Sequence, residues 1–145
     1  MTKEELLNKA MLIAIEAHKE QVDKNGQPYI GHIFRVMNMG KTMDEKICGV
    51  LLDIVEDTCW TFEMLKAEGF PQHIIDALKC LTKLSEDEPY ENFISRILTN
   101  DLAVRVKIND LSDNLDVKRY NELTERELNR LKKYLHWYKV LVDNG

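Results

Sequence analysis

The stretch ICGVLLDIVEDTCW, residues 47–60, is apolar around nearly its whole circumference when it is placed on a helix. A helix of this kind must be surrounded by other elements, because no side of it is suited to water. Elsewhere in the chain apolar residues recur at the 3.6-residue spacing of helices, and no segment shows the alternation of a strand. The sequence therefore predicts an all-α fold with this helix at its centre.

Capping signals and glycines place the helix boundaries. Ser/Thr-x-x-Glu boxes begin helices at Thr2, Thr42 and Thr124. Gly40 is expected to end a helix in a left-handed conformation, and Gly69 to end a short helix. The expected helices span about residues 2–20, 30–40, 42–57, 61–68, 71–82, 90–99, 102–118 and 125–142. We expect an array of about eight helices that forms one domain over residues 1–145, because no repeat or long linker divides it.

Composition limits the partners and the compartment. The net charge is −5, and the basic residues are spread among acids, which argues against a nucleic-acid partner but allows a small anion with a metal. No segment resembles a signal peptide or a membrane span, and the three cysteines lack paired spacing. We expect a cytoplasmic protein without a membrane partner. The apolar face of the last helix packs either inside the domain or against another copy, so a homo-oligomer is an open alternative.

Acidic residues interrupt the expected central helix. Glu56 and Asp57 follow Asp53 by three and four residues, which predicts that all three lie on one side of the helix near its C-terminal end. The helix macrodipole is negative there, and an isolated buried carboxylate is costly. Such a group of acids indicates a cation or a basic partner. The ordinary alternative is that Asp57 simply ends its helix.

A second core-like stretch, LAVRVKINDLSDNLDV at residues 102–117, also carries acids. Asp110 and Asn114 are four residues apart, so one helix face presents a carboxylate beside an amide. His32 is the nearest imidazole candidate for a site with these groups. The alternatives are that Asp113 and Asn114 are exposed, that His32 is an ordinary histidine, and that His18 is structural.

Three blocks of the sequence, AHKEQVDKNGQPYIGH, LLDIVEDT and VKINDLSDNL, resemble the hydrolase domain of the RelA/SpoT family, a branch of the HD superfamily. The blocks have the order and separations of that family, and the resemblance covers most of the chain. It implies an HD-type helical fold, and removal of the 3′ pyrophosphate from guanosine tetra- and pentaphosphate. No synthetase or regulatory domain follows, so we expect a small single-domain version.

The resemblance also implies a metal site. The family's ligands are a histidine after PYI, a His-Asp pair and a later aspartate, which fall on His32, on Leu52 with Asp53, and on Asp110. Leu52 therefore stands where the family has a ligand histidine. The family's usual metal is Mn²⁺, which prefers oxygen and imidazole ligands and would offset the charge of the two aspartates.

The same resemblance suggests residues for the water and the substrate. Glu56 and Asp57 match the acidic pair that activates the attacking water in the family, and Asn114 matches its asparagine. Lys24 is a candidate substrate contact, although Asp23 replaces a basic residue that often precedes it. The expected partner is a guanine nucleotide.

Leucine at position 52 cannot coordinate a metal. The loss of one ligand is expected to weaken the free energy of metal binding by roughly several kcal/mol. Three outcomes follow from this. The enzyme works weakly on the three remaining ligands, His18 substitutes for the missing one, or the site is inactive and the fold binds a nucleotide or a protein partner. Hydrolysis with impaired activity is the leading hypothesis, and the inactive binding protein is its alternative.

Overall fold

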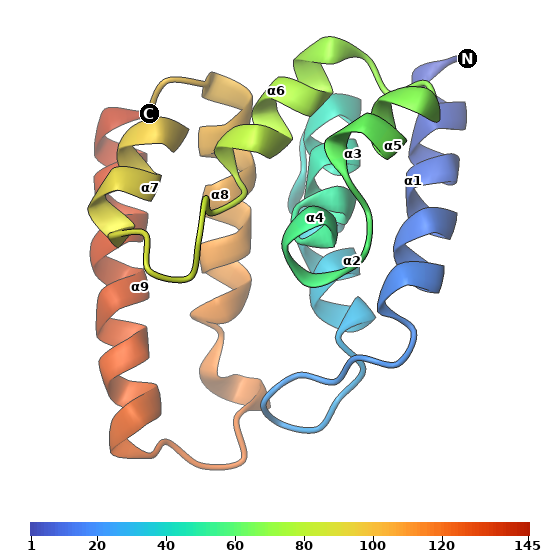
Figure 1. The fold of residues 1–145 in the computed structure, drawn as a ribbon. Helices are drawn as coiled ribbons and strands as arrows, with labels where there is room; N and C mark the ends of the chain where they lie inside the picture. Colours follow the sequence, from blue (N-terminus) through green and yellow to red (C-terminus); the bar gives the residue numbers. More distant parts are fainter.

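The computed structural model describes residues 1–145, which form an array of α-helices with only one isolated β-bridge (Figure 1). The helices are α1 (Lys3–His18), α2 (Ile30–Met39), α3 (Met43–Leu51), α4 (Ile54–Asp57), α5 (Phe62–Ala67), α6 (Gln72–Cys80), α7 (Tyr90–Ile97), α8 (Asp101–Asn114) and α9 (Glu125–Asn144), with a 3-10 turn, η1 (Val117–Arg119), before α9. All eight expected helical segments are present, and one of them is divided in two. The prediction of an all-α array is confirmed.

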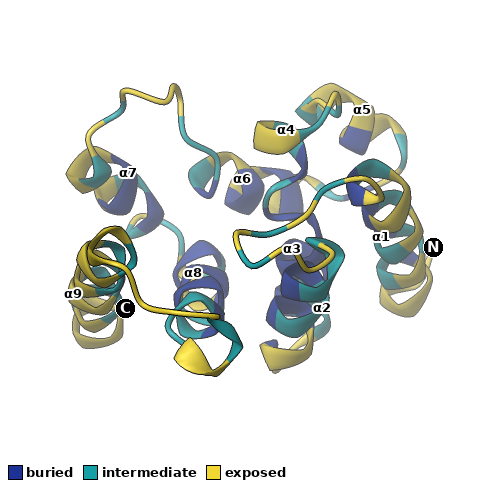
Figure 2. Ribbon diagram, turned by 90° about the horizontal axis from the view of Figure 1, so that it is seen from below, coloured by how far each residue is buried: buried dark blue, intermediate teal, exposed yellow.

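Helix α3 lies at the centre of the molecule, where it packs against α1, α2, α6 and α8. Figure 2 shows α1, α2, α8 and α9 in one row, with α4 to α7 opposite them and the buried residues between. Residues 47–51 of α3 are all buried. The all-round apolar stretch is therefore surrounded by other helices, as its sequence predicts.

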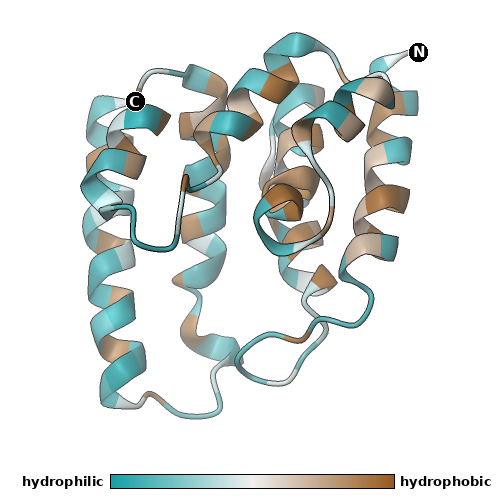
Figure 3. Cartoon of the chain, in the orientation of Figure 1, coloured by the Kyte–Doolittle hydropathy of each residue, from teal (hydrophilic) through white to brown (hydrophobic).

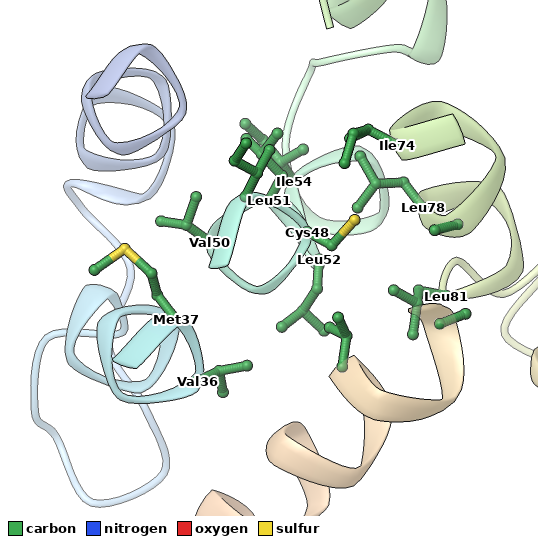
Figure 4. Packing of buried hydrophobic residues seen from close by; sticks show 14 of the residues in the cluster. Val36, Met37, Cys48, Val50, Leu51, Leu52, Ile54, Ile74, Leu78 and Leu81 are labelled. Atoms are coloured by element: carbon green, nitrogen blue, oxygen red, sulfur yellow. The ribbon is translucent and has the colours of Figure 1, made fainter. Parts of the chain in front are cut away.

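Leu52 belongs to the hydrophobic core. Its residue surface is only 2% exposed, and it is part of the single cluster of buried apolar side chains. Figure 4 shows it directly after α3, among apolar neighbours that include Val36 and Leu81. The leucine thus contributes apolar burial at this point of the chain.

The helix expected over residues 42–57 is interrupted, which is a correction to the sequence interpretation. Helix α3 ends at Leu51, and Asp53 precedes α4 with φ −105° and ψ 3°. Asp53, Glu56 and Asp57 therefore do not lie at the C-terminal end of one continuous helix. The bend brings the Asp53 carboxylate within hydrogen-bonding reach of the Tyr29 hydroxyl. That tertiary contact outweighs the local helical periodicity, which does not encode it.

Two other local expectations need correction. Gly40 is extended, with φ −65° and ψ 136°, and is not left-handed. Glycine is needed there for close packing, because a Cβ atom would lie 3.0 Å from the backbone nitrogen of Lys46. Gly69 does have a positive φ of 102°, as expected after α5. The hydroxyls of Thr2 and Thr42 cap α1 and α3, but the two-way capping box forms only at Thr124.

Figure 3 shows that hydrophilic residues cover much of α9, whereas apolar residues concentrate near α3. Leu141 is the one buried residue of α9, whose packing contacts are chiefly with α8. No helix in the structure combines the length and the apolar character needed to cross a membrane.

The cap at Thr124 is expected to stabilise α9 measurably. Its hydroxyl accepts a hydrogen bond from the Glu127 amide, which has no partner inside the helix. We expect Thr124→Ala to lower the free energy of unfolding in urea by about 1 kcal/mol, the usual cost of a lost N-cap. Thr124→Ser keeps the hydroxyl and is expected to retain most of that stability. Equal losses in both variants would show that the methyl group, and not the cap, is responsible.

Candidate active site

A pocket of about 380 Å³ lies between the loop after α1, the α3–α4 turn, the loop after α6, and helices α2, α7, α8 and α9. It contains most of the residues that the sequence suggested for a site, namely Lys24, His32, Asp53, Glu56, Asp110 and Asn114. Asp57 is not among its lining residues. Segments that are far apart in the sequence thus bring nearly all of the expected groups to one place.

His32, Asp53 and Asp110 form a compact group that could hold a metal ion. One ligand atom of each residue lies within 4.8 Å of the others. The His32 Nε2 atom is 2.9 Å from Asp110 Oδ1 and 4.0 Å from Asp53 Oδ2. These are the three residues that the family resemblance suggested as ligands.

The orientation of His32 is fixed by Asp113. The His32 Nδ1 atom lies 2.6 Å from Asp113 Oδ2, and the other carboxylate oxygen of Asp113 accepts a 2.8 Å hydrogen bond from Arg35 Nε. Arg119 contacts Asp113 as well, at 3.2 Å. An acid bonded to the far side of a histidine ring is the usual support of a metal-ligating imidazole. Asp113 is 1% exposed, so the alternative that it lies on the surface is wrong.

The charges in this group are strongly coupled. Burial alone would lower the pKa of His32, but hydrogen bonds and charges from Asp110 and Asp113 outweigh it and raise the pKa to about 10. Burial and the charge of Asp110 raise the pKa of Asp53 to about 6. The pKa of Asp110 is lowered, because Lys107 and His32 oppose the effect of burial. The proton on His32 balances the carboxylates, and an entering cation must displace it.

The carboxylates of Asp110 and Asp53 are each held by a second protein group as well. The buried Lys107 ammonium donates to Asp110 Oδ2 over 2.8 Å, and the Tyr29 hydroxyl donates to Asp53. The Asn114 amide lies 3.4 Å from Asp110 Oδ1. These contacts orient the acids before any ligand arrives.

The donor set fits a divalent metal ion. One imidazole and two carboxylates converge, which suits Mn²⁺ and similar cations. Leu52 lies in the core and does not line the pocket. His18 is not in the converging group, because its Nδ1 atom bonds Gln21 Oε1 at 2.8 Å and its ring packs against Tyr29. The Nε2 atom of His18 is buried without a hydrogen-bond partner, and the hypothesis that His18 replaces the missing ligand stays a prediction.

Glu56 and Asp57 point to different surroundings. Glu56 lines the pocket and accepts a 2.9 Å hydrogen bond from the backbone amide of Lys83. Asp57 is exposed, and its pKa is raised by partial burial and by the neighbouring charge of Glu56. Of this pair, only Glu56 faces the pocket.

The loop after α1 supplies the pocket mouth. Asp23 Oδ1 accepts hydrogen bonds from the amides of Asn25 and Gln27, at 2.9 and 3.0 Å. This acid therefore shapes the tight turn at Gly26, whose φ is 78°. Lys24 is exposed and lines the pocket, and its pKa is lowered by partial burial and by Arg130 and Arg126.

The chain is similar in sequence to several known proteins. No protein-family model matches the chain. A guanosine-3′,5′-bis(diphosphate) 3′-pyrophosphohydrolase from Aquifex aeolicus is 32% identical over 120 residues, which cover 77% of this chain. A protein of the same name from Haemophilus influenzae is 33% identical over 112 residues, or 70% of this chain. The matches cover 17% and 16% of those relatives, so the chain spans about a sixth of their length.

A solved structure of a metazoan ortholog of SpoT, described as hydrolysing ppGpp, matches the fold with a TM-score of 0.78 and 24% identity. The match covers 96% of this chain and 84% of that one. This chain is a RelA/SpoT-type HD domain. Three of the four ligand positions that the family resemblance suggested carry residues that converge and could hold a metal ion, and Leu52 stands at the fourth.

Several residues of the HD domain site were missed or undervalued from the sequence. Arg35, Lys107 and Asp113 lie three residues from His32 or Asp110 on the same helices, and this spacing is a signal that could have found them. Tyr29 stands in the PYI element beside His32, but its bond to Asp53 depends on the tertiary fold. The same is true of Lys83, Tyr90 and Lys133, which reach the pocket from three separate segments.

Proposed function

We propose that this HD domain is a metal-dependent pyrophosphohydrolase that removes the 3′ pyrophosphate from a guanosine 3′,5′-bis(diphosphate)-like nucleotide. The observation that carries the proposal is the convergence of His32, Asp53 and Asp110 in one pocket, with Asp113 supporting the histidine. The names of the relatives supply the substrate class. Other matching relatives are named GTP pyrophosphokinase or probable GTP pyrophosphokinase, but they too match over only 16% of their length.

In the proposed reaction, a water oxygen bonds to the phosphorus attached to the ribose 3′ oxygen. The bond between that phosphorus and O3′ breaks, and the products are a 3′ hydroxyl and pyrophosphate. His32, Asp53 and Asp110 would hold a divalent metal, Mn²⁺ in our proposal, which would supply positive charge to polarise a phosphoryl oxygen and to lower the pKa of a water molecule. Phosphoryl transfer depends mainly on such positioning and charge neutralisation.

The side chains of the chain itself orient the reactants. In this proposal Glu56, which lines the pocket, accepts a proton from the attacking water, and Asp57 is the second member of the acidic pair. Lys24 at the mouth and Asn114 beside Asp110 are the proposed substrate contacts. Lys107 keeps Asp110 ionised by its hydrogen bond, which preserves the ligand for the metal.

Metal analysis combined with a hydrolysis assay tests this function. The purified protein is expected to release pyrophosphate from guanosine 3′,5′-bis(diphosphate), and the rate is expected to rise with Mn²⁺ up to millimolar concentrations. Asp53→Asn is expected to lower the rate by about a hundredfold or more, since supporting residues alone change metal sites by 10–100-fold. Asp101→Asn, an exposed acid on α8, is the control. Absence of both bound metal and turnover in excess Mn²⁺ would reject the proposal.

The second candidate function is nucleotide binding without cleavage. The burial of Leu52 in the core supports it, as does the balance of the site charges by a proton on His32 and by Lys107. In that case guanine nucleotides would raise the melting temperature without forming product.

We further propose that residues 1–145 act as one domain, in the cytoplasm, on a small molecule and not on nucleic acid. One contiguous core supports the first point. The free Cys48, Cys59 and Cys80 support the second. The excess of acids over bases in the chain supports the third. A homo-oligomer stays a prediction.

A further inference from the structure

Three lysines gather around one aromatic ring at the side of the pocket formed by α7 and α9. The ammonium nitrogens of Lys83, Lys107 and Lys133 lie 5.4, 5.8 and 4.2 Å from the centre of the Tyr90 ring. They come from the loop after α6, from α8 and from α9, respectively. All four residues line the pocket. We refer to Lys83, Lys107, Lys133 and Tyr90 as the lysine cluster.

Two of these lysines have no acidic partner. Lys107 is paired with Asp110 at 2.8 Å, whereas Lys83 and Lys133 form no ion pair within 4.0 Å. Glu56 is close, but its hydrogen bond is to the backbone amide of Lys83 and not to its ammonium group. In a chain with a net charge of −5, two unpaired lysines in one pocket are a local concentration of positive charge.

The surroundings of Lys133 add to this concentration. Partial burial and the nearby charges of Lys83, Lys107 and Arg130 lower the pKa of Lys133. The buried Nη1 atom of Arg130 has no hydrogen-bond partner. Neighbouring like charges are destabilising, and an anion between Lys83 and Lys133, which have no ion pair of their own, would relieve the repulsion.

The pocket therefore has two chemically different ends. His32, Asp53 and Asp110 form the end that attracts a cation, and the lysine cluster forms the end that attracts an anion. Lys107 joins the two, because its ammonium bonds Asp110 and also lies 5.2 Å from the centre of the Phe93 ring. An anion at the cluster would lie beside a residue that holds the proposed metal ligand.

We propose that the lysine cluster is a binding subsite for a phosphoryl group, in which Lys83 and Lys133 contact the phosphoryl oxygens and Tyr90 and Lys107 form the floor. The inference rests on the proposed function only in treating the pocket as a nucleotide site. The phosphoryl group belongs either to the bound nucleotide or to released pyrophosphate, since the two share this chemistry. Ammonium groups favour both through charge-assisted hydrogen bonds.

Calorimetric titration in a metal-free buffer containing EDTA tests the subsite without requiring turnover. The probes are inorganic pyrophosphate, guanosine 5′-diphosphate and guanosine. The test protein carries Lys83→Met and Lys133→Met, and the control carries Lys132→Met and Lys139→Met, which remove the same charge from exposed positions of α9. We expect the wild-type protein and the control to bind pyrophosphate alike, and the test protein to bind it at least about tenfold more weakly.

The titrations with guanosine 5′-diphosphate and guanosine identify the source of the phosphoryl group. If the cluster binds the nucleotide, the preference for guanosine 5′-diphosphate over guanosine should shrink about tenfold in the test protein alone. If only pyrophosphate binding weakens, the cluster holds the released product. The subsite is overturned if pyrophosphate binding weakens equally in the test and control proteins, or in neither. It is also overturned if the wild-type protein neither binds pyrophosphate nor prefers guanosine 5′-diphosphate to guanosine.

These results are separable from the hydrolase proposal. Weakened binding in the test protein supports the subsite even if the wild-type protein has no metal and no turnover. Conversely, if the wild type hydrolyses the nucleotide and the test protein has the same KM and kcat, the hydrolase stands and the subsite is rejected.

Discussion

Replacing Leu52 with histidine is expected to tighten Mn²⁺ binding by at least about tenfold to a hundredfold, the change that even supporting residues make in metal sites. His32, Asp53 and Asp110 already converge, and Asp113 already orients His32. The family resemblance implies one more donor at position 52, where Leu52 now lies in the core, so the new imidazole must turn toward the neighbouring Asp53 to reach the metal. Isothermal titration with Mn²⁺ measures the affinity, and pyrophosphate release is expected to rise with it.

The same substitution is expected to destabilise the metal-free protein. Leu52 is 2% exposed in an apolar core, and an imidazole without a partner there costs about 1–3 kcal/mol. Saturating Mn²⁺ should recover this loss, because a ligand that binds only the folded state stabilises it. Urea unfolding with EDTA measures the loss of stability, and urea unfolding with Mn²⁺ measures its recovery.

Leu51→His is the matched control for this experiment. Leu51 is equally buried, at 1% exposure, but belongs to the end of α3 and does not occupy the family's ligand position. It should be destabilised in the same way, and Mn²⁺ should stabilise it no more than it stabilises the wild-type protein, which binds through the same three residues. If Mn²⁺ stabilises both histidine variants equally, or neither, Leu52 does not occupy a ligand position.

Asp110→Asn is expected to have the second large effect, on stability as well as on metal binding. The Asp110 carboxylate accepts hydrogen bonds from His32, at 2.9 Å, and from the buried ammonium of Lys107, at 2.8 Å. Removing its charge leaves the Lys107 ammonium buried without a carboxylate, and breaking a buried ion pair in this way costs about 3–5 kcal/mol. Unfolding in urea with EDTA measures the loss independently of any activity.

A double substitution separates the ion pair from general damage to the pocket. Lys107→Met added to Asp110→Asn removes the unpaired ammonium, so part of the lost stability should return. Asp101→Asn at the exposed start of α8 should cost no more than about 0.3–1 kcal/mol. A loss for Asp110→Asn no larger than that of Asp101→Asn would contradict the buried ion pair.

Much of the fold could be predicted because helical periodicity and capping are local. The eight expected segments all form helices, and the all-round apolar stretch at residues 47–60 is central. The break at Leu52 and Asp53 could not be predicted in this way. It depends on Asp53 meeting Tyr29 from the start of α2, a contact that no local pattern contains.

The site shows the same division between local and tertiary information. Family resemblance suggested His32, Asp53 and Asp110, and the fold brings their ligand atoms together. The carboxylate of Asp113 was noticed only as a member of an acidic stretch, because its burial against His32 and Arg35 follows from the packing of α2 on α8. Lysines from separate segments have no shared sequence pattern at all, so the lysine cluster is visible only in three dimensions.

Helix α9 is attached to the rest of the molecule chiefly through α8, and Leu141 is its single buried residue. Segments with few buried contacts open more often than the core of the same protein. Lys133 and Tyr134 line the pocket from α9, whereas His32 and Asp110 belong to α2 and α8, so an opening of α9 would remove only the first two from the pocket. Ligand affinity at the lysine cluster would then be scaled by the fraction of time that α9 is docked.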